Sequence, residues 1–387
     1  SKRTRTKGAV METTSPQQTA GSSVNLGGGA GRAVERESVW HENLLFGVSR
    51  TFALTIPQLP DELRETVTNA YLLCRIADTI EDDPLLASAE KDRFHTAFFE
   101  AVETGCGADA FARDLSPRLA RSTLDAEVEL IRESSRVLEF TRALKPRQRQ
   151  AVLQCLSTMV EGMGEYERNR GLDGLANVAD LHHYCYFVAG VVGEMLTELF
   201  CDYSQEIEAN RVQLEPRAIS FGLGLQMTNI LKDIWDDHEH DRCWLPREVF
   251  KRHGYDLRMI APDHHGNTEA FAASLHELIG IAHRHLREAL AYTLAIPSHE
   301  TGIRRFLIWA VLLAVSTLAK IANQPLFTSG AQVKVSRPRV GAIIAASNTM
   351  IRSNGGLTTL FNTTAKRLPL NTGFRAPVTI RKESPTP

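Results

Sequence analysis

Gln-Met-Thr-Asn-Ile-Leu-Lys-Asp-Ile-Trp-Asp-Asp, at residues 226–237, is the stretch of this sequence that decides the fold. Helical spacing would place four oxygen-bearing side chains on one face, those of Gln226, Asn229, Asp233 and Asp237. Like charges at such spacings destabilise a helix by roughly 0.2–0.5 kcal/mol per pair, and Asp236 adds another carboxylate beside them. We therefore expect a positive partner at this face.

A second acidic stretch lies upstream, where Asp-Thr-Ile-Glu-Asp-Asp occupies residues 78–83 behind the apolar run 70–77. A helix here would line one face with Tyr71, Arg75, Asp78 and Asp82. Glu81 would lie beside that face, and Asp83 would point away from it. Pro84 cannot continue the helix, so these acids lie near a helix C-terminus, where the macrodipole disfavours negative charge.

The two Asp-x-x-x-Asp faces, 155 positions apart when counted from Asp78 to Asp233, make chemical sense as opposing walls of one cleft. Mg²⁺ held by one or two carboxylates completes its coordination shell with water and substrate phosphate. Either stretch alone is more often a solvated helix face. The pair, each in apolar surroundings, instead favours a metal site that binds a diphosphate.

Composition excludes several classes of protein. The 387 residues are 43% hydrophobic and 23% charged, with no run of short alternating strands, which predicts an all-α fold with an ample core. The net charge of −2 gives no overall basic character that would suggest nucleic acid as a partner. The six scattered cysteines indicate reduced core residues, and no apolar run reaches the roughly 18 residues of a membrane span.

The chain divides into three predicted parts. Residues 1–37, rich in Gly, Ser, Thr and Gln, are predicted to be a disordered tail, residues 38–368 a single catalytic domain, and residues 369–387 a flexible tail. Apolar periodicity predicts helices at 61–83, 89–104, 125–144, 146–168, 181–201, 268–294, 302–323 and 340–368.

Three smaller features leave alternatives open. Ser49-Arg50 before a helix suits phosphate binding, although a surface arginine with a capping serine is the commoner arrangement. Gly190 and Gly193 inside an apparent helix suggest close approach by another helix or by an apolar ligand. The small and acidic residues 162–167 suit either the cleft or plain helix packing.

With these residues assembled, the chain resembles the squalene/phytoene synthase family, the head-to-head isoprenyl diphosphate synthases. The resemblance covers roughly residues 39–368 and rests on four ordered motifs, Ser49–Phe52, Tyr71–Asp83, Tyr184–Gly193 and Gln226–Asp237. It implies an isoprenoid synthase-like helical bundle around a central cleft with two facing aspartate-rich helices.

The resemblance also implies roles for individual residues. It implies that Mg²⁺, or Mn²⁺ in its place, is bound by Asp78, Glu81, Asp82, Asn229, Asp233 and Asp237. It implies that the diphosphate is bound by Ser49, Arg50, Arg75, Gln226, Asn229, Lys232 and Arg242. It places at the catalytic centre Phe52, Tyr71, Arg75 and Tyr184.

General chemistry agrees with these roles. Metal ions and bases stabilise a departing diphosphate, so that C–O ionisation leaves an allylic cation. Aromatic faces such as those of Phe52, Tyr71, Tyr184 and Phe187 could stabilise the cation by about 0.5–2 kcal/mol each. Apolar helical walls would exclude water, which quenches the cation. A tyrosine hydroxyl near the diphosphate could assist the proton loss that closes a cyclopropane.

The squalene-forming branch of the family reduces the cyclopropyl intermediate with NADPH, whereas phytoene and dehydrosqualene synthases do not. Residues 306–319 and 334–337 look similar to segments that serve this second step, which implies cofactor contacts at Ser49, Phe306, Lys334 and Arg337. The match departs from the family at Ser336 and at Trp309-Ala-Val311. No G-x-G-x-x-G fingerprint is present, so a Rossmann-type site is not indicated.

The resemblance thus implies condensation of two farnesyl diphosphates to presqualene diphosphate, followed by NADPH-dependent rearrangement to squalene for sterol or hopanoid biosynthesis. A relative that omits the reduction and a non-catalytic helical protein that binds apolar partners are the alternatives. We expect no C-terminal membrane helix of the eukaryotic kind, and hence a bacterial-type cytoplasmic monomer in peripheral contact with the inner membrane surface.

Overall fold

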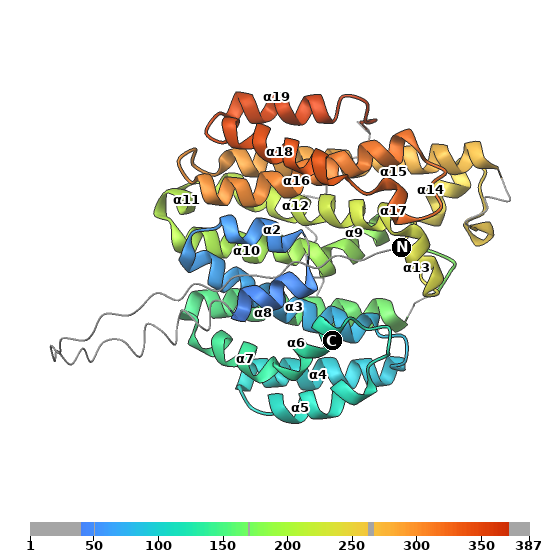
Figure 1. Ribbon diagram of the computed structural model, residues 1–387. Helices are drawn as coiled ribbons and strands as arrows, with labels where there is room; N and C mark the ends of the chain where they lie inside the picture. The colour runs from blue at the N-terminus through green and yellow to red at the C-terminus, as the bar shows by residue number, and fades with distance from the viewer. Residues whose placement is uncertain (1–39, 50, 169–170, 262–266, 371–387) are drawn as a thin grey trace, which may run out of the picture. The chain divides into compact units, whose positions relative to one another are not determined.

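A computed structural model describes residues 40–49, 51–168, 171–261 and 267–370. Figure 1 shows that these residues form a stack of helices, and within them there is no β-strand, only an isolated parallel bridge between Leu175 and Pro246. The predicted all-α fold is confirmed. The predicted tail 1–37 and all but the first two residues of the predicted tail 369–387 lie outside the described residues.

Residues 40–48 are helical and precede the first named element. The α-helices that follow are α2 (Phe52–Thr55), α3 (Asp61–Asp82), α4 (Ser88–Thr104), α5 (Ala108–Leu115), α6 (Asp125–Arg132), α7 (Ser134–Ala143), α8 (Pro146–Arg168), α9 (Val178–Cys185), α10 (Val191–Tyr203), α11 (Gln205–Ala209), α12 (Arg211–Lys232), α13 (Ile234–Glu239), α14 (Arg247–Arg252), α15 (Thr268–Ala295), α16 (Thr301–Asn323), α17 (Gly330–Val333), α18 (Arg337–Met350) and α19 (Asn354–Thr364). Short 3₁₀ turns span Ile56–Gln58, Ser116–Arg118 and Leu257–Met259, and a π-helical turn joins α9 to α10 at Tyr186–Gly190.

Helix α12 is central to the packing, since it contacts α10, α15, α16 and the π turn. Glycines allow this close approach. A Cβ on Gly193 of α10 would lie 2.0 Å from the Ala218 carbonyl oxygen, and a Cβ on Gly222 of α12 would lie 2.1 Å from the Ala189 carbonyl oxygen. Another helix, rather than a ligand, is therefore what approaches this glycine-containing segment.

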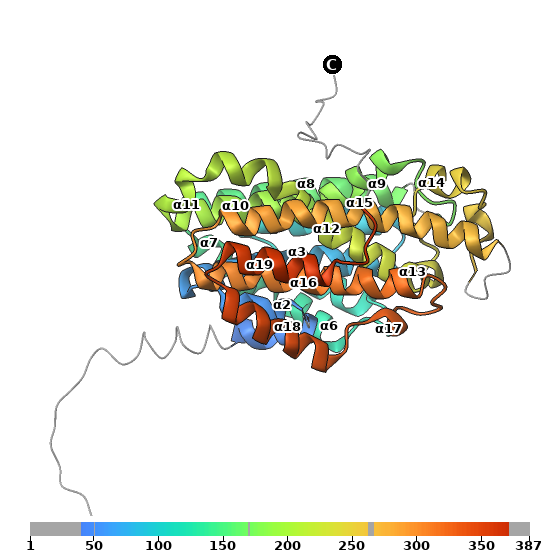
Figure 2. The same cartoon turned by 90° about the horizontal axis from the view of Figure 1, so that it is seen from above.

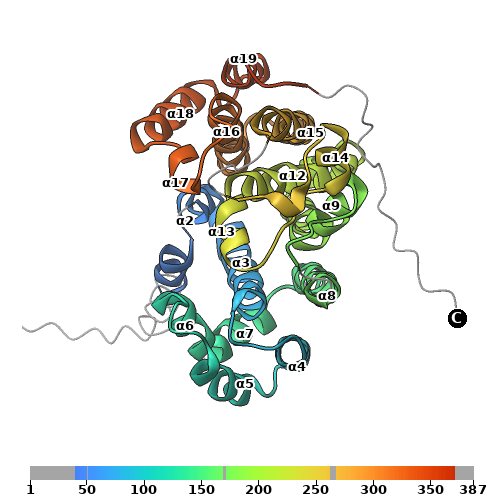
Figure 3. The same ribbon diagram turned by 90° about the vertical axis from the view of Figure 1, so that its right-hand side faces the viewer.

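Helix α3 lies between the centre of the fold and the group α4–α7, as the end-on view in Figure 3 shows. It packs against α4, α6, α7 and α8. Two predicted single helices are each two helices in the structure. Residues 125–144 break at Glu133, which is the C-cap of α6, and residues 340–368 break before Ser353, whose hydroxyl accepts the Gly356 N–H at 3.0 Å and starts α19.

The C-terminal helices form an outer layer. Figure 2 shows α18 and α19 on the outside of α16, and all three helices contact one another. Of the 23 residues of α16, 15 are buried, whereas Ile343 and Ser347 are the only buried residues of α18.

Two segments are long and apolar enough to cross a membrane by length and composition alone. They are Val178–Tyr203 and Thr301–Asn323. In the most apolar part of each segment, 72% and 67% of the stretch, respectively, is buried inside the fold. Their hydrophobicity is accounted for by the core they form.

Candidate active site

The first acidic stretch ends α3. The helix stops at Asp82, because Asp83 adopts an extended conformation and Pro84 follows. Asp83 is buried, and its carboxylate accepts the N–H groups of Leu85 at 2.9 Å and Ala120 at 2.7 Å. It therefore points away from the other acids, as predicted, and holds the loops that follow α3.

Two buried cations cap the C-terminus of α3. Lys91 donates to the Glu81 carbonyl and to the Glu167 carboxylate, the latter at 2.8 Å. Arg242 donates to the same Glu81 carbonyl at 2.9 Å and pairs with the Asp82 carboxylate. Cations at a helix C-terminus satisfy its free carbonyls and oppose its dipole, so these two contacts account for the survival of an acidic cluster there.

The second acidic stretch is not one continuous helix, contrary to our prediction. Helix α12 ends at Lys232 and α13 begins at Ile234, with Asp233 at the break (φ −101°, ψ 16°). The Asp233 N–H still donates to the Asn229 carbonyl, and the Asp237 N–H to the Asp233 carbonyl, both at 2.8 Å. The i to i+4 register of Asn229, Asp233 and Asp237 is therefore preserved across the break.

Arg242 connects the two stretches. Arg242 follows α13 and reaches Asp82 of α3, 160 positions away in the sequence. The charge of Asp82 also raises the pKa of Asp237, after the larger effect of burial. Burial, followed by the charges of Glu81, Asp82 and Asp237, raises the pKa of Tyr184. Both acidic stretches and this tyrosine therefore share one electrostatic environment.

Burial dominates the acid–base properties of the site. It raises the pKa of Asp78 to about 7 and that of Asp237 to about 7, and it also raises the pKa of Glu81. Neighbouring arginines lower each of these pKa values in part, Arg75 for Asp78 and Arg242 for the other two. Carboxylates that ionise with difficulty gain most from a further positive charge.

This donor set fits a metal ion that arrives with a phosphate. Within the described residues, no three His, Cys, Asp or Glu side chains converge closely enough to hold an ion by themselves. Mg²⁺ is usually bound by one or two carboxylates plus water and substrate oxygens, and Asp82 and Asp237 supply such a pair from two helices.

Aromatic side chains surround the acids. Tyr184 stacks on Trp244 with ring centroids 4.0 Å apart and an interplanar angle of 9°, and Tyr166 meets the Tyr184 ring edge-on at 5.1 Å. On the α3 side, the ring centroids of Phe52 and Tyr71 lie 4.9 Å apart. A small cavity of about 10 Å³, roughly the space of one water, lies beside this cluster and is lined by residues that include Asp237, Arg242 and Trp244.

The squalene/phytoene synthase family model matches residues 45–339, more than half of the chain. The chain belongs to this family. It is 30% identical over 313 residues to squalene synthase ERG9 of Saccharomyces cerevisiae, covering 79% of this chain and 66% of that protein. It is 29% identical over 308 residues to squalene synthase BSS of Botryococcus braunii, covering 78% and 63%. The chain thus spans about two thirds of the length of these relatives.

Solved structures support the family fold. The fold is similar to that of TcSQS in complex with the ligand BPH1237, with a TM-score of 0.65 at 22% identity over 86% of this chain and 98% of that one. It is also similar to a ligand-bound dehydrosqualene synthase, with a TM-score of 0.57 at 21% identity over 83% and 99%. The predicted isoprenoid synthase-like bundle is confirmed at the level of the fold.

Several residues that the family resemblance placed at the diphosphate are already engaged. Arg75 donates to Glu127 of α6 at 3.0 Å and lies 3.7 Å from Asp78. The Lys232 ammonium nitrogen lies 3.0 Å from an Asp233 carboxylate oxygen. Ser49 accepts the Phe52 N–H at 3.0 Å, so it caps the following turn.

The other residues predicted to bind diphosphate are less constrained by contacts or lie outside the described residues. Gln226 is half-buried, and Asn229 is exposed, with its amide oxygen 3.4 Å from the Lys232 ammonium. Arg50 lies outside the described residues. Their roles in binding stay predictions.

The predicted cofactor residues do not converge on one surface. Phe306 is 3% exposed and packs edge-on against Phe200 of α10, which places it in the core. Lys334 is exposed and close enough to Asp233 for its charge to lower the pKa of that carboxyl, against the larger raising effect of burial. Arg337 is exposed at the first residue of α18. Helix α17 brings this segment to the acids, since a Cβ on Gly330 would lie 3.3 Å from an Asp233 carboxylate oxygen.

Four residues of the site were missed at the sequence level: Lys91, Glu127, Tyr166 and Trp244. Each comes from a segment remote from the residue it contacts. The sequence indicates only that charged groups of α3 need partners of opposite charge. Many lysines and glutamates could serve, so Lys91 and Glu127 could not be singled out.

Proposed function

We propose that the protein is a squalene synthase. It joins two farnesyl diphosphates head to head into presqualene diphosphate and then rearranges that product reductively to squalene with NADPH. The observation that carries this proposal is the position of Arg242, which pairs with Asp82 and lowers the pKa of Asp237, together with the pKa of Tyr184, which both carboxylates raise after the larger effect of burial. The names of the similar curated proteins support the same activity.

Asp78 and Asp82 on one side, and Asp233 and Asp237 on the other, would hold Mg²⁺ or Mn²⁺, which on binding neutralises the diphosphate and eases its departure. The carboxyls of Asp78 and Asp237 have pKa values of about 7. They are therefore partly protonated near neutral pH, and a cation would draw them into the ionised form.

Arg242 and Arg75 orient the substrate. Each guanidinium is held by a carboxylate, Arg242 by Asp82 and Arg75 by Glu127. A planar guanidinium so fixed can present its free N–H groups to a phosphate without a large loss of side-chain entropy. The cavity beside Arg242 has room for about one water, so a prenyl diphosphate must move side chains as it enters.

The aromatic cluster protects and stabilises the cation. The Tyr184–Trp244 stack and the Phe52–Tyr71 pair offer ring faces at the edge of the acidic region. Burial raises the pKa of the Tyr184 and Tyr71 hydroxyls, which keeps them protonated. Each can therefore donate a hydrogen bond to the diphosphate, and the departing diphosphate can take up the proton lost from carbon.

Lys334 and Arg337 are the residues that we assign to the phosphates of NADPH. Both are exposed, and Lys334 lies close enough to Asp233 to connect this segment with the reaction site. We further propose that the protein acts as a cytoplasmic monomer.

A second candidate is an enzyme of the same family that stops without reduction. Phe306 favours it, because this ring is occupied by packing against Phe200 and does not face an open surface. The departures at Trp309-Ala-Val311 and at Ser336 point the same way.

A product assay distinguishes the candidates. The purified protein is incubated with farnesyl diphosphate and Mg²⁺, with and without NADPH, and the products are identified by mass spectrometry. Squalene formed only with NADPH, with presqualene diphosphate or dehydrosqualene formed without it, supports the proposal. The same product in both reactions assigns the protein to the branch without reduction. No release of diphosphate from any prenyl donor would leave a helical binding protein.

A further inference from the structure

Charge is distributed very unevenly along this chain. Residues 301–370 contain no Asp or Glu and carry nine bases: Arg304, Arg305, Lys320, Lys334, Arg337, Arg339, Arg352, Lys366 and Arg367. The rest of the chain has 35 bases and all 46 acids. A protein with a net charge of only −2 therefore combines a strongly basic segment with an acidic remainder.

Five of these bases lie on one element, the α18–α19 hairpin (residues 337–370). They are Arg337, Arg339, Arg352, Lys366 and Arg367, and all five are exposed. Within the part of the chain that the structure describes, none of the five has a carboxylate partner. Arg211, by contrast, is paired with three glutamates.

The hairpin presents small and apolar groups between these bases. Ile343 and Ser347 are the buried residues of α18, and Gly341, Ala342 and Ala345 are exposed. Helix α19 is fixed from below, where Phe361 is buried and stacks on His283 of α15 with ring centroids 6.0 Å apart. The exposed surface of the hairpin thus has positive charge and no acids, and it is supported by the core through Phe361.

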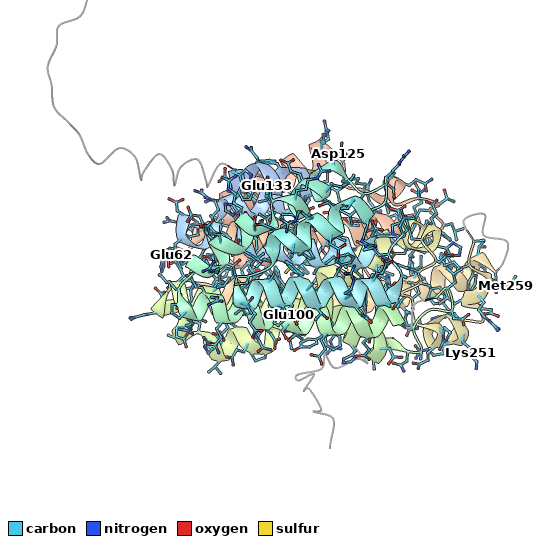
Figure 4. All side chains as sticks on the ribbon, turned by 90° about the horizontal axis from the view of Figure 1, so that it is seen from below. Glu62, Glu100, Asp125, Glu133, Lys251 and Met259 are labelled. Carbon is cyan, nitrogen blue, oxygen red and sulfur yellow. The ribbon has the colours of Figure 1, made fainter. Side chains whose placement is uncertain are left out.

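The hairpin and a set of acids lie on opposite sides of the fold. Figure 2, seen from above, shows α18 and α19 facing the viewer, and Figure 4, seen from below, labels Glu62, Glu100, Asp125 and Glu133 together with the base Lys251. Acids and bases are mixed on that side, whereas the hairpin has bases alone, and a surface of one sign of charge orients a protein in front of a surface of the opposite sign.

We propose that the outer side of the α18–α19 hairpin docks on an anionic lipid bilayer. Anionic headgroups would meet the four hairpin bases that are not assigned to NADPH, and the small apolar residues of α18 would let the backbone approach the interface closely. These four are Arg339, Arg352, Lys366 and Arg367. The proposal does not depend on the enzymatic activity. Docking there would leave Asp82 and Asp237 within the fold and free to react.

Lipid fits this surface better than the other anionic partners. Single-stranded nucleic acids bind to grooves in which aromatic side chains stack on bases, and α18 contains no aromatic residue. A second copy of the chain would offer its acidic side, but acids such as Glu62 are themselves paired, here with Lys145.

The experiment measures binding of the full chain to vesicles. Wild-type protein is sedimented with vesicles of phosphatidylcholine alone and of phosphatidylcholine containing about one third phosphatidylglycerol. We expect binding only to the anionic vesicles, with the affinity falling at least about tenfold as NaCl rises from about 0.05 M to about 0.5 M. In the variant, four hairpin bases are replaced together: Arg339→Gln, Arg352→Gln, Lys366→Gln and Arg367→Gln.

Each base near an anionic surface strengthens binding roughly fivefold, so four should together contribute at least about 50-fold. Lys334 and Arg337 stay intact, which keeps the assigned cofactor residues out of the test. A matched control removes four exposed bases outside the hairpin, Arg113→Gln, Arg121→Gln, Arg132→Gln and Lys251→Gln. The control should bind anionic vesicles within about threefold of wild type, because it has the same net charge as the variant but keeps the hairpin.

Several outcomes overturn the proposal. Equal loss of binding in the variant and in the control would make net charge, and not this surface, responsible. Undiminished binding of the variant, or wild-type binding to neutral vesicles at the same affinity, would place the contact elsewhere. Wild-type protein that ignores both vesicles but binds a single-stranded oligonucleotide, or that forms a dimer that the variant does not form, would assign the hairpin to a nucleic acid or to a second copy.

Discussion

Replacing Asp237 by asparagine should make the protein more stable at pH 8, although it should remove activity. Burial, together with the charges of Asp233 and Asp82, raises the pKa of this carboxyl from 3.8 to about 7, against the lowering effect of Arg242. An acid with a raised folded-state pKa stabilises the fold only while it is protonated. That contribution is complete below pH 3.8 and is lost as the pH rises through 7.

The size of the effect follows from the two pKa values. A rise from 3.8 to about 7 corresponds to at most about 4 kcal/mol. Because Asp237 is only half-buried, solvent screens part of this interaction, and we expect the free energy of unfolding to increase by about 1–2 kcal/mol at pH 8. At pH 5 the wild-type carboxyl is protonated in the fold, so the advantage of the variant should drop below about half of that value.

Urea unfolding in EDTA, followed by circular dichroism at pH 8 and pH 5, measures both quantities. Asp236→Asn is the control, since this neighbouring carboxylate is exposed and its loss should change the free energy of unfolding by less than about 0.5 kcal/mol. The reasoning fails if Asp237→Asn unfolds at a lower urea concentration than wild type at pH 8. It fails equally if the stability difference is the same at both pH values.

Three further predictions concern the site, the packing and the cofactor. Asp82→Ala should abolish diphosphate release at saturating Mg²⁺ with unchanged helicity by circular dichroism, and retained turnover would contradict the metal assignment. Gly193→Ala should lower the free energy of unfolding by about 1–3 kcal/mol, because its Cβ would lie 2.0 Å from the Ala218 carbonyl oxygen. Gly341→Ala in α18, where a Cβ would face open space, should instead raise the free energy of unfolding by about 0.5–1 kcal/mol. Similar effects of the two variants in urea unfolding would refute the packing argument. Lys334→Ala should slow squalene formation more than presqualene diphosphate formation in the product assay, and equal losses would remove its cofactor role.

The fold was predictable because its signals are local. The apolar period, together with Pro84 and Pro146 at helix boundaries, predicted α3 and α8 to within a residue of their observed ends. The breaks at Glu133 and Asp233 were not predicted. Neither residue is a proline or glycine, so no helix-breaking residue type marks either position in the sequence.

The site was predictable only in part. The acids and aromatic residues of the motifs lie together, because a cluster of like charges is an anomaly that a sequence displays. Their counter-charges are different. Lys91 and Glu127 are ordinary residues, and their roles arise only from the packing of α4 and α6 against α3.

Arg242 shows why these two kinds of residue must be considered together. It satisfies a carbonyl at the end of α3 and a carboxylate of the first acidic stretch, and it lowers the pKa of Asp237 in the second. A residue that only capped the helix would leave the acids repelling one another. Because this buried cation also faces carboxyls of both stretches, it reduces their repulsion, while burial still makes Glu81 and Asp237 hard to ionise. The gain in the free energy of unfolding that we expect for Asp237→Asn therefore measures how much the buried, mutually repelling carboxylates destabilise the fold.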